Sequence, residues 1–288
     1  MKRAINQYMR DMRKLLTKKQ FRNRIRLYFI YHRLIIKNIF TTKLFKIKTN
    51  KDTLLGLNFY YDNFNSFFGM FTEIFIHNIY DFKTKEKAPV IFDCGANIGI
   101  ATLYFKYRFP ESKVEAFEPD RKAFELLKKN VQMNRLKDVN LHNVALGDKN
   151  GEITLYSHGD FEGCTGNTMN KEFINFPNVQ ENKVKMIPLS SIKTNKITYL
   201  KLDIEGEEDK VLWDMNNKGL LKKTEQVCLE YHYNYQKKEN KLSKVIKIIE
   251  EEKFHYIINI NLLNNYEMTI KDYKKNRNRY VLMINCFR

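Results

Sequence analysis

The chain has 288 residues, of which 43% are hydrophobic and 14% aromatic. This is enough apolar material for a sizeable core, and it excludes an intrinsically disordered protein. The four cysteines form no CxxC pair, which argues against a zinc site or a disulfide framework and favours reduced thiols in a cytoplasmic protein. The net charge of +18 is concentrated at one end, because residues 1–48 contain 15 Lys or Arg and a single acid, Asp11.

This basic arm, residues 1–48, has no apolar run near the roughly 20 residues that a transmembrane helix needs, and it lacks a signal-peptide pattern. Two sets of apolar residues recur in it at roughly helical spacing. The sets are Leu27, Ile30 and Leu34, and Phe29, Ile36 and Phe40. We therefore expect a helical extension. It could pack on its own domain, contact an anionic surface at the inner membrane face, or contact RNA.

Strand-like and helical patterns alternate after a charged segment, residues 80–89, that is typical of a linker. We expect strands at 90–92, 113–117, 139–144, 152–156, 199–203, 226–230, 255–260 and 280–286, and helices at 98–107, 121–134, 207–215 and 241–252. This order predicts an α/β fold with a doubly wound, mostly parallel sheet, whose last two strands form an antiparallel pair at one edge. Residues 157–181 show little periodicity, and we expect a long loop there that covers the acceptor.

The most informative motif is Asp-x-Gly-x-x-x-Gly, which runs from Asp93 to Gly99 between a predicted strand and a predicted helix. Gly95 and Gly99 allow the backbone to pass close to a ligand, and the helix N-terminus offers free N–H groups. The spacing is not the Gly-x-Gly-x-x-Gly of dinucleotide sites. Asp93 at the strand end would repel a pyrophosphate but suits the amino group of a methionine moiety. The motif therefore favours S-adenosylmethionine, with Ala96 and Asn97 in the binding turn.

A second acid strengthens this prediction. Glu118 follows the strand at 113–117, 19 residues beyond Gly99. An acid at the end of the second strand of such a unit accepts hydrogen bonds from ribose hydroxyls. We therefore expect Glu118 to bind the cofactor ribose.

Several segments together resemble the FkbM-type methyltransferases, a branch of the class I S-adenosylmethionine enzymes. The similar segments are Glu73–Ile76, Asp93–Gly99, Phe117–Pro119, Asn143–Asp148 and Leu200–Glu207. The resemblance implies a seven-stranded sheet, S-adenosylmethionine as methyl donor, and mostly O-methylation, often of sugars in surface glycans or of natural products. It also implies that Asn143 and Ala145 flank the adenine. It begins near Phe71, so we expect an extension over residues 1–70 and a methyltransferase domain over residues 71–288.

Four polar residues follow two predicted strands and are the candidate catalytic groups. They are Asp203, Glu205, Glu230 and His232. Ligands of open α/β sheets lie outside the carboxyl ends of the strands, so these side chains should meet the cofactor there. A hydroxyl acceptor needs a base, and His232 is the best single candidate because its usual pKa is near neutral. Asp203 could instead hold the cofactor. Carboxylates and a histidine could also bind a divalent metal, although the spacing does not indicate one.

The leading hypothesis is therefore an S-adenosylmethionine-dependent O-methyltransferase that acts on a sugar or another small molecule. One alternative is an RNA methyltransferase that uses the basic arm as an electrostatic contact. Another is a non-catalytic cofactor-binding scaffold at a membrane surface. The nearly neutral body argues against nucleic acid, and the four candidate catalytic groups argue against a scaffold.

Overall fold

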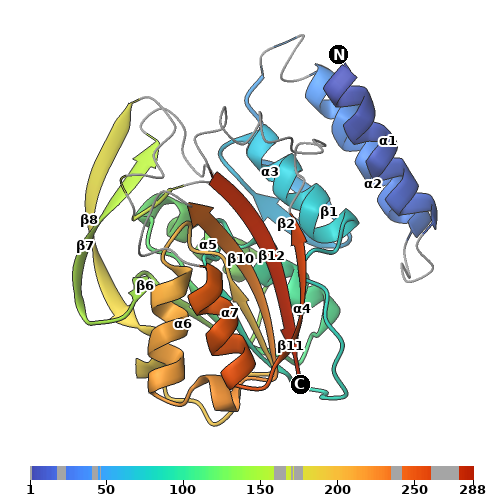
Figure 1. The fold of residues 1–288 in the computed structure, drawn as a ribbon. Helices are drawn as coiled ribbons and strands as arrows, with labels where there is room; N and C mark the ends of the chain where they lie inside the picture. Colours follow the sequence, from blue (N-terminus) through green and yellow to red (C-terminus); the bar gives the residue numbers. More distant parts are fainter. Residues whose placement is uncertain are drawn as a thin grey trace.

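A computed structural model describes residues 2–17, 24–40, 45, 47–158, 167–169, 171, 178–234, 242–260 and 279–288. Its centre is a seven-stranded sheet in the order β11-β12-β10-β9-β3-β4-β5 (Figure 1). The strands are β3 (Val90–Cys94), β4 (Lys113–Phe117), β5 (Val139–His142), β9 (Tyr199–Leu202), β10 (Gln226–Asn234), β11 (His255–Ile260) and β12 (Arg279–Phe287). All pairs are parallel except those of β12, which runs antiparallel to both β10 and β11.

This sheet confirms the predicted doubly wound, mostly parallel α/β fold. The antiparallel pair forms as expected, with β11 at the edge and β12 inside it. Every residue of β9 is buried, as in a parallel strand that is covered on both faces. The helices α4 (Ile100–Arg108) and α5 (Arg121–Met133) contribute to one hydrophobic cluster, and α6 (Glu208–Asn217) and α7 (Leu242–Glu251) to another. Figure 1 shows the two pairs on opposite faces.

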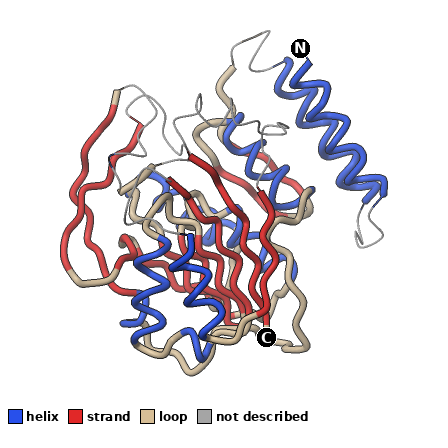
Figure 2. The backbone as a smooth tube through the Cα atoms, viewed as in Figure 1, coloured by secondary structure: helices blue, strands red, loops and turns tan. Residues whose placement is uncertain are grey.

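A smaller three-stranded sheet follows β5 in the chain and was only partly expected. Its order is β6-β8-β7, from β6 (Ala145–Gly147), β7 (Gly151–His158) and β8 (Val179–Pro188) (Figure 2). The strand expected at residues 152–156 lies within β7, but β8 lies partly in the segment assigned to a loop. Two short 3-10 turns, Leu189–Ser191 and Leu221–Lys223, complete this half of the chain.

The N-terminal extension is helical only in part. It contains α1 (Lys2–Thr17), α2 (Arg24–Lys37), a hairpin of β1 (Lys51–Leu54) and β2 (Leu57–Tyr60), and α3 (Phe64–Phe71). The hairpin, which the sequence did not predict, docks on α5 through two asparagines. The Asn130 amide accepts from Tyr60 N at 2.7 Å and donates to Tyr60 O at 2.9 Å, and Asn134 binds the Asn58 backbone in the same way.

The expected domain boundary at residue 70 does not coincide with a break in the structure. The helix α3 continues directly into a π-helical turn, η2 (Thr72–Ile76), and one hydrophobic cluster includes residues on both sides. The segment at 80–89 is not a free linker, because Tyr80 and Phe82 are buried. The Phe82 ring stacks on Tyr199 of β9 with centroids 4.1 Å apart. The extension and the sheet therefore share one core.

The basic arm packs on this core through one face. Leu27, Ile30 and Leu34 are buried. The arm's only acid, Asp11, is also buried and accepts hydrogen bonds from Tyr31 and from His77 of the body, both at 2.6 Å. Packing on its own domain, the first of the three interpretations, is therefore observed. Among the described residues, every helix is too short or too polar to cross a membrane.

Candidate active site

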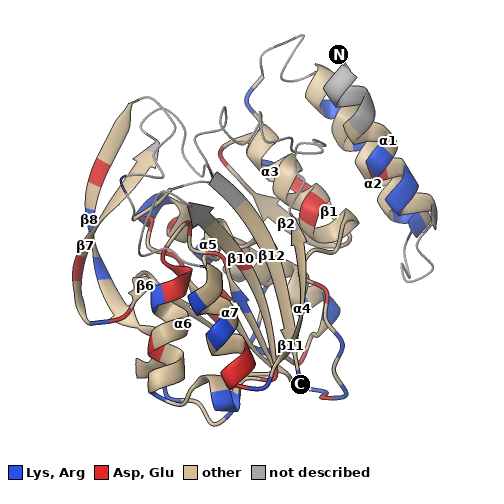
Figure 3. Cartoon of the chain, viewed as in Figure 1, with Lys and Arg blue, Asp and Glu red and all other residues tan. Residues whose placement is uncertain are grey.

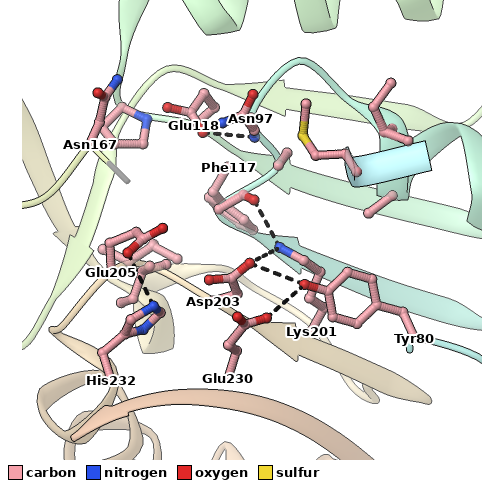
Figure 4. A pocket seen from close by; sticks show the side chains of 18 of the residues that line it. Tyr80, Asn97, Phe117, Glu118, Asn167, Lys201, Asp203, Glu205, Glu230 and His232 are labelled. Atoms are coloured by element: carbon pink, nitrogen blue, oxygen red, sulfur yellow. Dashed lines mark hydrogen bonds and ion pairs between the residues drawn. The ribbon is translucent and has the colours of Figure 1, made fainter. Parts of the chain in front are cut away.

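A cavity of about 430 Å³ opens at the carboxyl ends of β3, β4, β9 and β10 (Figure 4). Its size falls within the range of about 300–1,000 Å³ that is usual for small-molecule sites. Most of the predicted site residues line it. They are Gly95, Ala96, Asn97, Glu118, Asp203, Glu205, Glu230 and His232. The topology therefore brings together side chains from four strand ends, as expected for ligands of an open α/β sheet.

The glycine turn after β3 is shaped by two different close contacts. A Cβ on Gly95, whose φ is 81°, would lie 1.7 Å from the carbonyl oxygen of Asp203. A Cβ on Gly99 would instead lie 2.6 Å from Leu127 Cδ1, at the contact between α4 and α5. Gly95 thus lines the cavity and lets β3 approach β9. Gly99 lies outside the cavity lining and serves helix packing, which differs from its predicted cofactor contact.

Glu118 extends from the end of β4 to the glycine turn. Its Oε2 accepts a hydrogen bond from Asn97 N at 2.8 Å, and its Oε1 accepts from Asp120 N at 2.8 Å. Burial raises the pKa of Glu118 to about 8, although these two backbone hydrogen bonds act to lower it. A hydroxyl partner would stabilise its charged form, so its placement suits the predicted ribose contact.

Asp93 does not lie where the sequence analysis expected it. Its side chain is fully buried and outside the cavity lining, and it accepts a hydrogen bond from Thr102 Oγ1 at 2.6 Å. It also lies 3.4 Å from the Nζ of Lys201. Direct contact with a methionine amino group is therefore not supported. Asp93 ties α4 to β3 and balances a buried cation.

The two residues expected to flank an adenine do not line the cavity, but the residue that follows each of them does. The cavity is lined by Val144 and Leu146 instead of Asn143 and Ala145. The Asn143 amide donates to the carbonyl oxygens of Glu118 and Pro119 at 2.8 and 3.1 Å, and Ala145 is buried in the core of the smaller sheet. Successive side chains of an extended segment point to opposite sides, which is why the neighbours of the expected residues reach the cavity.

An acidic cluster forms the wall of the cavity opposite Glu118. The Tyr80 hydroxyl lies 3.1 Å from Asp203 Oδ2 and 3.2 Å from Glu230 Oε2, so its single hydrogen is shared between two acceptors (Figure 4). Burial and then Asp203 raise the pKa of Tyr80 well above its usual value, so the phenol stays protonated. Tyr80 was not expected in the site, because it lies in a charged segment without a recognisable motif.

Lys201 is the buried cation of this cluster. Its ammonium donates to the carbonyl oxygen of Gly95 at 2.8 Å and lies 3.5 Å from Asp203 Oδ2. Burial acts to lower the pKa of Lys201, but Asp203 and Asp93 outweigh it and hold the pKa above its usual value. The lysine therefore stays charged and links the glycine turn to the acids.

Two further carboxyl groups, besides that of Glu118, have pKa values near neutral. Burial, and then the charge of Asp203, raise the pKa of Glu230 to about 8 and that of Glu73 to about 7. Glu73 lies in η2 and also lines the cavity. From the sequence, Glu73 stands out only as part of the segment Glu73–Ile76 that resembles the FkbM-type methyltransferases, so no role in the site was expected for it.

His232 is held between two acids, which argues against its predicted role as general base, and that role stays a prediction. Its Nδ1 lies 2.9 Å from Glu208 Oε1 and its Nε2 lies 3.1 Å from Glu205 Oε2. Burial acts to lower the pKa of His232, but Glu205 and Glu208 raise it well above its usual value. At neutral pH the ring is therefore an imidazolium whose two N–H groups are both engaged. It cannot accept a proton from a substrate in this state.

Replacing His232 with Gln is expected to lower the free energy of unfolding by about 3 kcal/mol, because it leaves the buried Glu208 without its cation. Urea denaturation measures this loss. The paired substitution His232→Gln with Glu208→Gln should recover part of it. A different result would support His232 as the general base. In that case His232→Gln would keep the wild-type stability, and the rate of methyl transfer would no longer increase with pH.

The spacing of Asp203, Glu205 and His232 matches that of a cation site. Among the described residues, one ligand atom each from Asp203, Glu205 and His232 lies within 4.8 Å of the others. In this arrangement the Nε2 of His232 faces Glu205 as an ion pair. The divalent metal considered from the sequence stays a prediction.

Part of the expected acceptor loop reaches the cavity. Asn167 and Met169 line it, and the hydroxyl of Thr168 donates to the carbonyl oxygen of Glu205 at 2.6 Å. The rest of that loop, residues 159–166, 170 and 172–177, lies outside the described residues. The described part therefore borders the cavity between Asp120, to which Asn167 donates at 3.3 Å, and the backbone of Glu205.

Residues 93–257 match the model of the methyltransferase FkbM domain. The chain belongs to this family. Membership confirms the resemblance carried by Asp93–Gly99 and Leu200–Glu207 and makes the protein a methyltransferase. A curated relative, Methyltransferase 1 of Beauveria bassiana, is 29% identical over 168 residues, which cover 50% of this chain and 68% of that protein. Methyltransferase sdnD of Sordaria araneosa is 38% identical over 65 residues, which cover 23% and 25%.

Solved structures show lower identity. The methyltransferase FkbM from Methylobacillus flagellatus KT is 14% identical, with a TM-score of 0.45, and the match covers 78% of this chain and 54% of that one. The chain therefore spans about half the length of that relative. TYW2 of M. jannaschii, solved in complex with AdoMet, is 11% identical, with a TM-score of 0.44 and coverage of 83% and 86%.

Proposed function

We propose that this protein transfers a methyl group from S-adenosylmethionine to a hydroxyl oxygen of a sugar or another small molecule. The observation that carries the proposal is the cavity itself. It joins the glycine turn at Gly95, the buried Glu118 and an acidic wall at the ends of four strands. Acceptor hydroxyls of surface glycans are the preferred class, because the family resemblance points to sugars and the loop at residues 167–169 covers a small site.

The residues present fit this cofactor. S-adenosylmethionine has a sulfonium and an ammonium group, both positive, and a ribose with two hydroxyls. Asp203 supplies negative charge to the cavity wall. Glu230 and Glu73 add carboxyl groups that ionise near neutral pH, and Glu118 supplies an acceptor for ribose hydroxyls. When bound, the cofactor supplies an electrophilic methyl group. The protein's part is to bind and align both partners and to remove the acceptor proton.

Glu230 is the candidate base in this proposal. Its pKa of about 8 lies closer to neutral than that of an ordinary carboxyl, which makes it a stronger base. Tyr80 shares its hydroxyl hydrogen between Glu230 and Asp203 and thereby orients both carboxylates. The acceptor hydroxyl passes its proton to Glu230, while Asp203 and Lys201 keep the neighbouring wall charged.

Replacing Glu230 with Gln is expected to lower kcat/KM for methyl transfer by about 10²–10⁴-fold, which is the usual contribution of a general base. In the wild type, kcat/KM should rise with pH through about 8, because Glu230 must lose its proton to act. The Gln variant should lose this rise. Glu115→Gln, on β4 outside the cavity lining, is the control. An unchanged pH profile in Glu230→Gln would rule Glu230 out as the base.

The proposed function is tested first by calorimetric titration with S-adenosylmethionine. Transfer of a labelled methyl group is then measured against nucleotide sugars and glycan precursors, with RNA as a control, in the presence and absence of a chelator. Absence of cofactor binding would refute the proposal. Methylation of RNA without methylation of any hydroxyl acceptor would favour the RNA alternative, and loss of activity with chelator would establish the metal.

A further inference from the structure

The helix α2 has two apolar faces, and only one of them is buried. Leu27, Ile30 and Leu34 point into the core. The opposite face and the turn that follows α2 expose four large apolar side chains, which we call the outward stripe. The stripe is Ile25, Phe29, Ile36 and Phe40, with exposed fractions of 76%, 66%, 54% and 51%. At about 100° per residue, Ile25, Phe29 and Ile36 fall within about 40° of one another, and Phe40 follows one turn later.

Exposed apolar side chains gather in this part of the molecule. Among the described residues, sixteen large hydrophobic side chains are largely exposed, and ten of them belong to residues 1–48. The others are scattered over the body, for example Trp213 on α6. Single exposed apolar residues are ordinary, but a contiguous set of this kind marks an interaction surface.

The charge around the outward stripe is mainly positive, although Asp52 of β1 lies 4.0 Å from the guanidinium of Arg33. Arg26 and Arg33 are exposed and lie along one edge of the stripe at helical spacing. The arm's single acid, Asp11, is turned inward to Tyr31 and His77, so it does not offset these cations at the surface. Figure 3 shows blue segments of the ribbon, which mark Lys and Arg, on α1 and α2.

We propose that the outward stripe docks on an anionic lipid surface. Apolar side chains enter the boundary between headgroups and acyl chains, and flanking Arg or Lys side chains bind anionic headgroups, so this surface satisfies both halves of the pattern. A second copy of the chain would bring two strongly basic arms together. RNA phosphates would bind the cations but would leave the aliphatic part of the stripe in water.

The arm is fixed to the part of the body that builds the catalytic cavity. Its helix α1 contacts η2, which carries Glu73 and Ile74 in the cavity wall, and Asp11 binds His77 directly after η2. A docked arm therefore holds the cavity near the membrane, which suits an acceptor hydroxyl on a lipid-anchored molecule. This last step rests on the proposed function, whereas the docking does not.

Flotation of the full chain with lipid vesicles tests the docking. Vesicles of phosphatidylcholine with about one quarter phosphatidylglycerol should bind the wild type, and pure phosphatidylcholine vesicles should bind it about tenfold less or weaker. The double variant Phe29→Asp with Ile36→Asp should lower the partition coefficient by at least about tenfold. Arg26→Glu should lower the partition coefficient by a smaller factor. Raised salt should remove the difference between Arg26→Glu and the wild type, because salt screens the charge of Arg26.

Trp213→Asp, an exposed apolar residue outside the arm, is the matched control and should bind vesicles like the wild type. All variants should keep the wild-type melting temperature and affinity for S-adenosylmethionine, so a failure of docking is separate from a failure of the proposed function. Equal vesicle binding by the double variant and the wild type would overturn the proposal. The proposal would also be overturned if the wild type formed a dimer that the double variant does not form. The same holds if the wild type bound RNA but not anionic vesicles.

Discussion

Replacement of Lys201 with Met is expected to lower the free energy of unfolding by about 3–5 kcal/mol. The lysine side chain is almost fully buried between Asp93 and Asp203, at 3.4 and 3.5 Å. Methionine has a similar length, so the change removes the charge with little change in volume. Asp93, which is fully buried, is then left as an uncompensated anion, and breaking a buried ion pair from one side is the costly case.

Urea denaturation of the Lys201→Met variant measures this loss, with two comparisons. Lys87→Met removes a surface cation that lies 3.1 Å from Glu111, with both side chains largely exposed, and should cost at most about 1 kcal/mol. The double variant Lys201→Met with Asp93→Asn should recover part of the stability, because the stranded charge is gone. A cost for Lys201→Met no larger than that for Lys87→Met would show that the buried pair does not stabilise the fold.

Substitution of Gly95 with Ala is expected to weaken binding of S-adenosylmethionine by at least about 100-fold and to abolish methyl transfer. The added Cβ would lie 1.7 Å from the carbonyl oxygen of Asp203 and 2.9 Å from its carbonyl carbon. Both atoms belong to the backbone, so the ends of β3 and β9 must separate to make room. When a bound reactant is misplaced by about 1 Å, the reaction rate falls roughly 100-fold, which sets the scale of the loss expected here.

Substitutions at two other glycines distinguish the effect of the Cβ clash at Gly95 from the cost of a positive φ for a residue with a side chain. Gly56 has a φ of 85°, close to the 81° of Gly95, but nothing lies within 4 Å of its added Cβ. Gly56→Ala should therefore cost about 1–2 kcal/mol in stability and leave binding unchanged. Gly99→Ala should fall between the two, because the atom it meets is the end of the flexible Leu127 side chain. Equal binding by Gly95→Ala and Gly56→Ala would refute the close-approach explanation.

Most of the geometry of the cavity depends on contacts between residues far apart in the sequence, which local sequence patterns do not predict. Tyr80 meets Asp203 and Glu230 across separations of 123 and 150 residues, and it lies in a segment that resembled a linker. His232 was correctly expected at the cavity, but its protonation depends on Glu208, which the sequence analysis did not place there. Asp93 was correctly placed at a strand end, yet burial turned it away from the ligand.

Three features could be predicted from the amino-acid sequence alone: the alternation of strands and helices, the turn from Asp93 to Gly99, and the two apolar sets in the arm. These follow from periodicity and spacing, which are local properties of the chain. Which of the two apolar sets is buried follows from packing: Leu27, Ile30 and Leu34 face the core, whereas Phe29, Ile36 and Phe40 are exposed. Burial and charge neighbours come from segments far apart in the chain, and they also set the pKa values of Glu230 and His232.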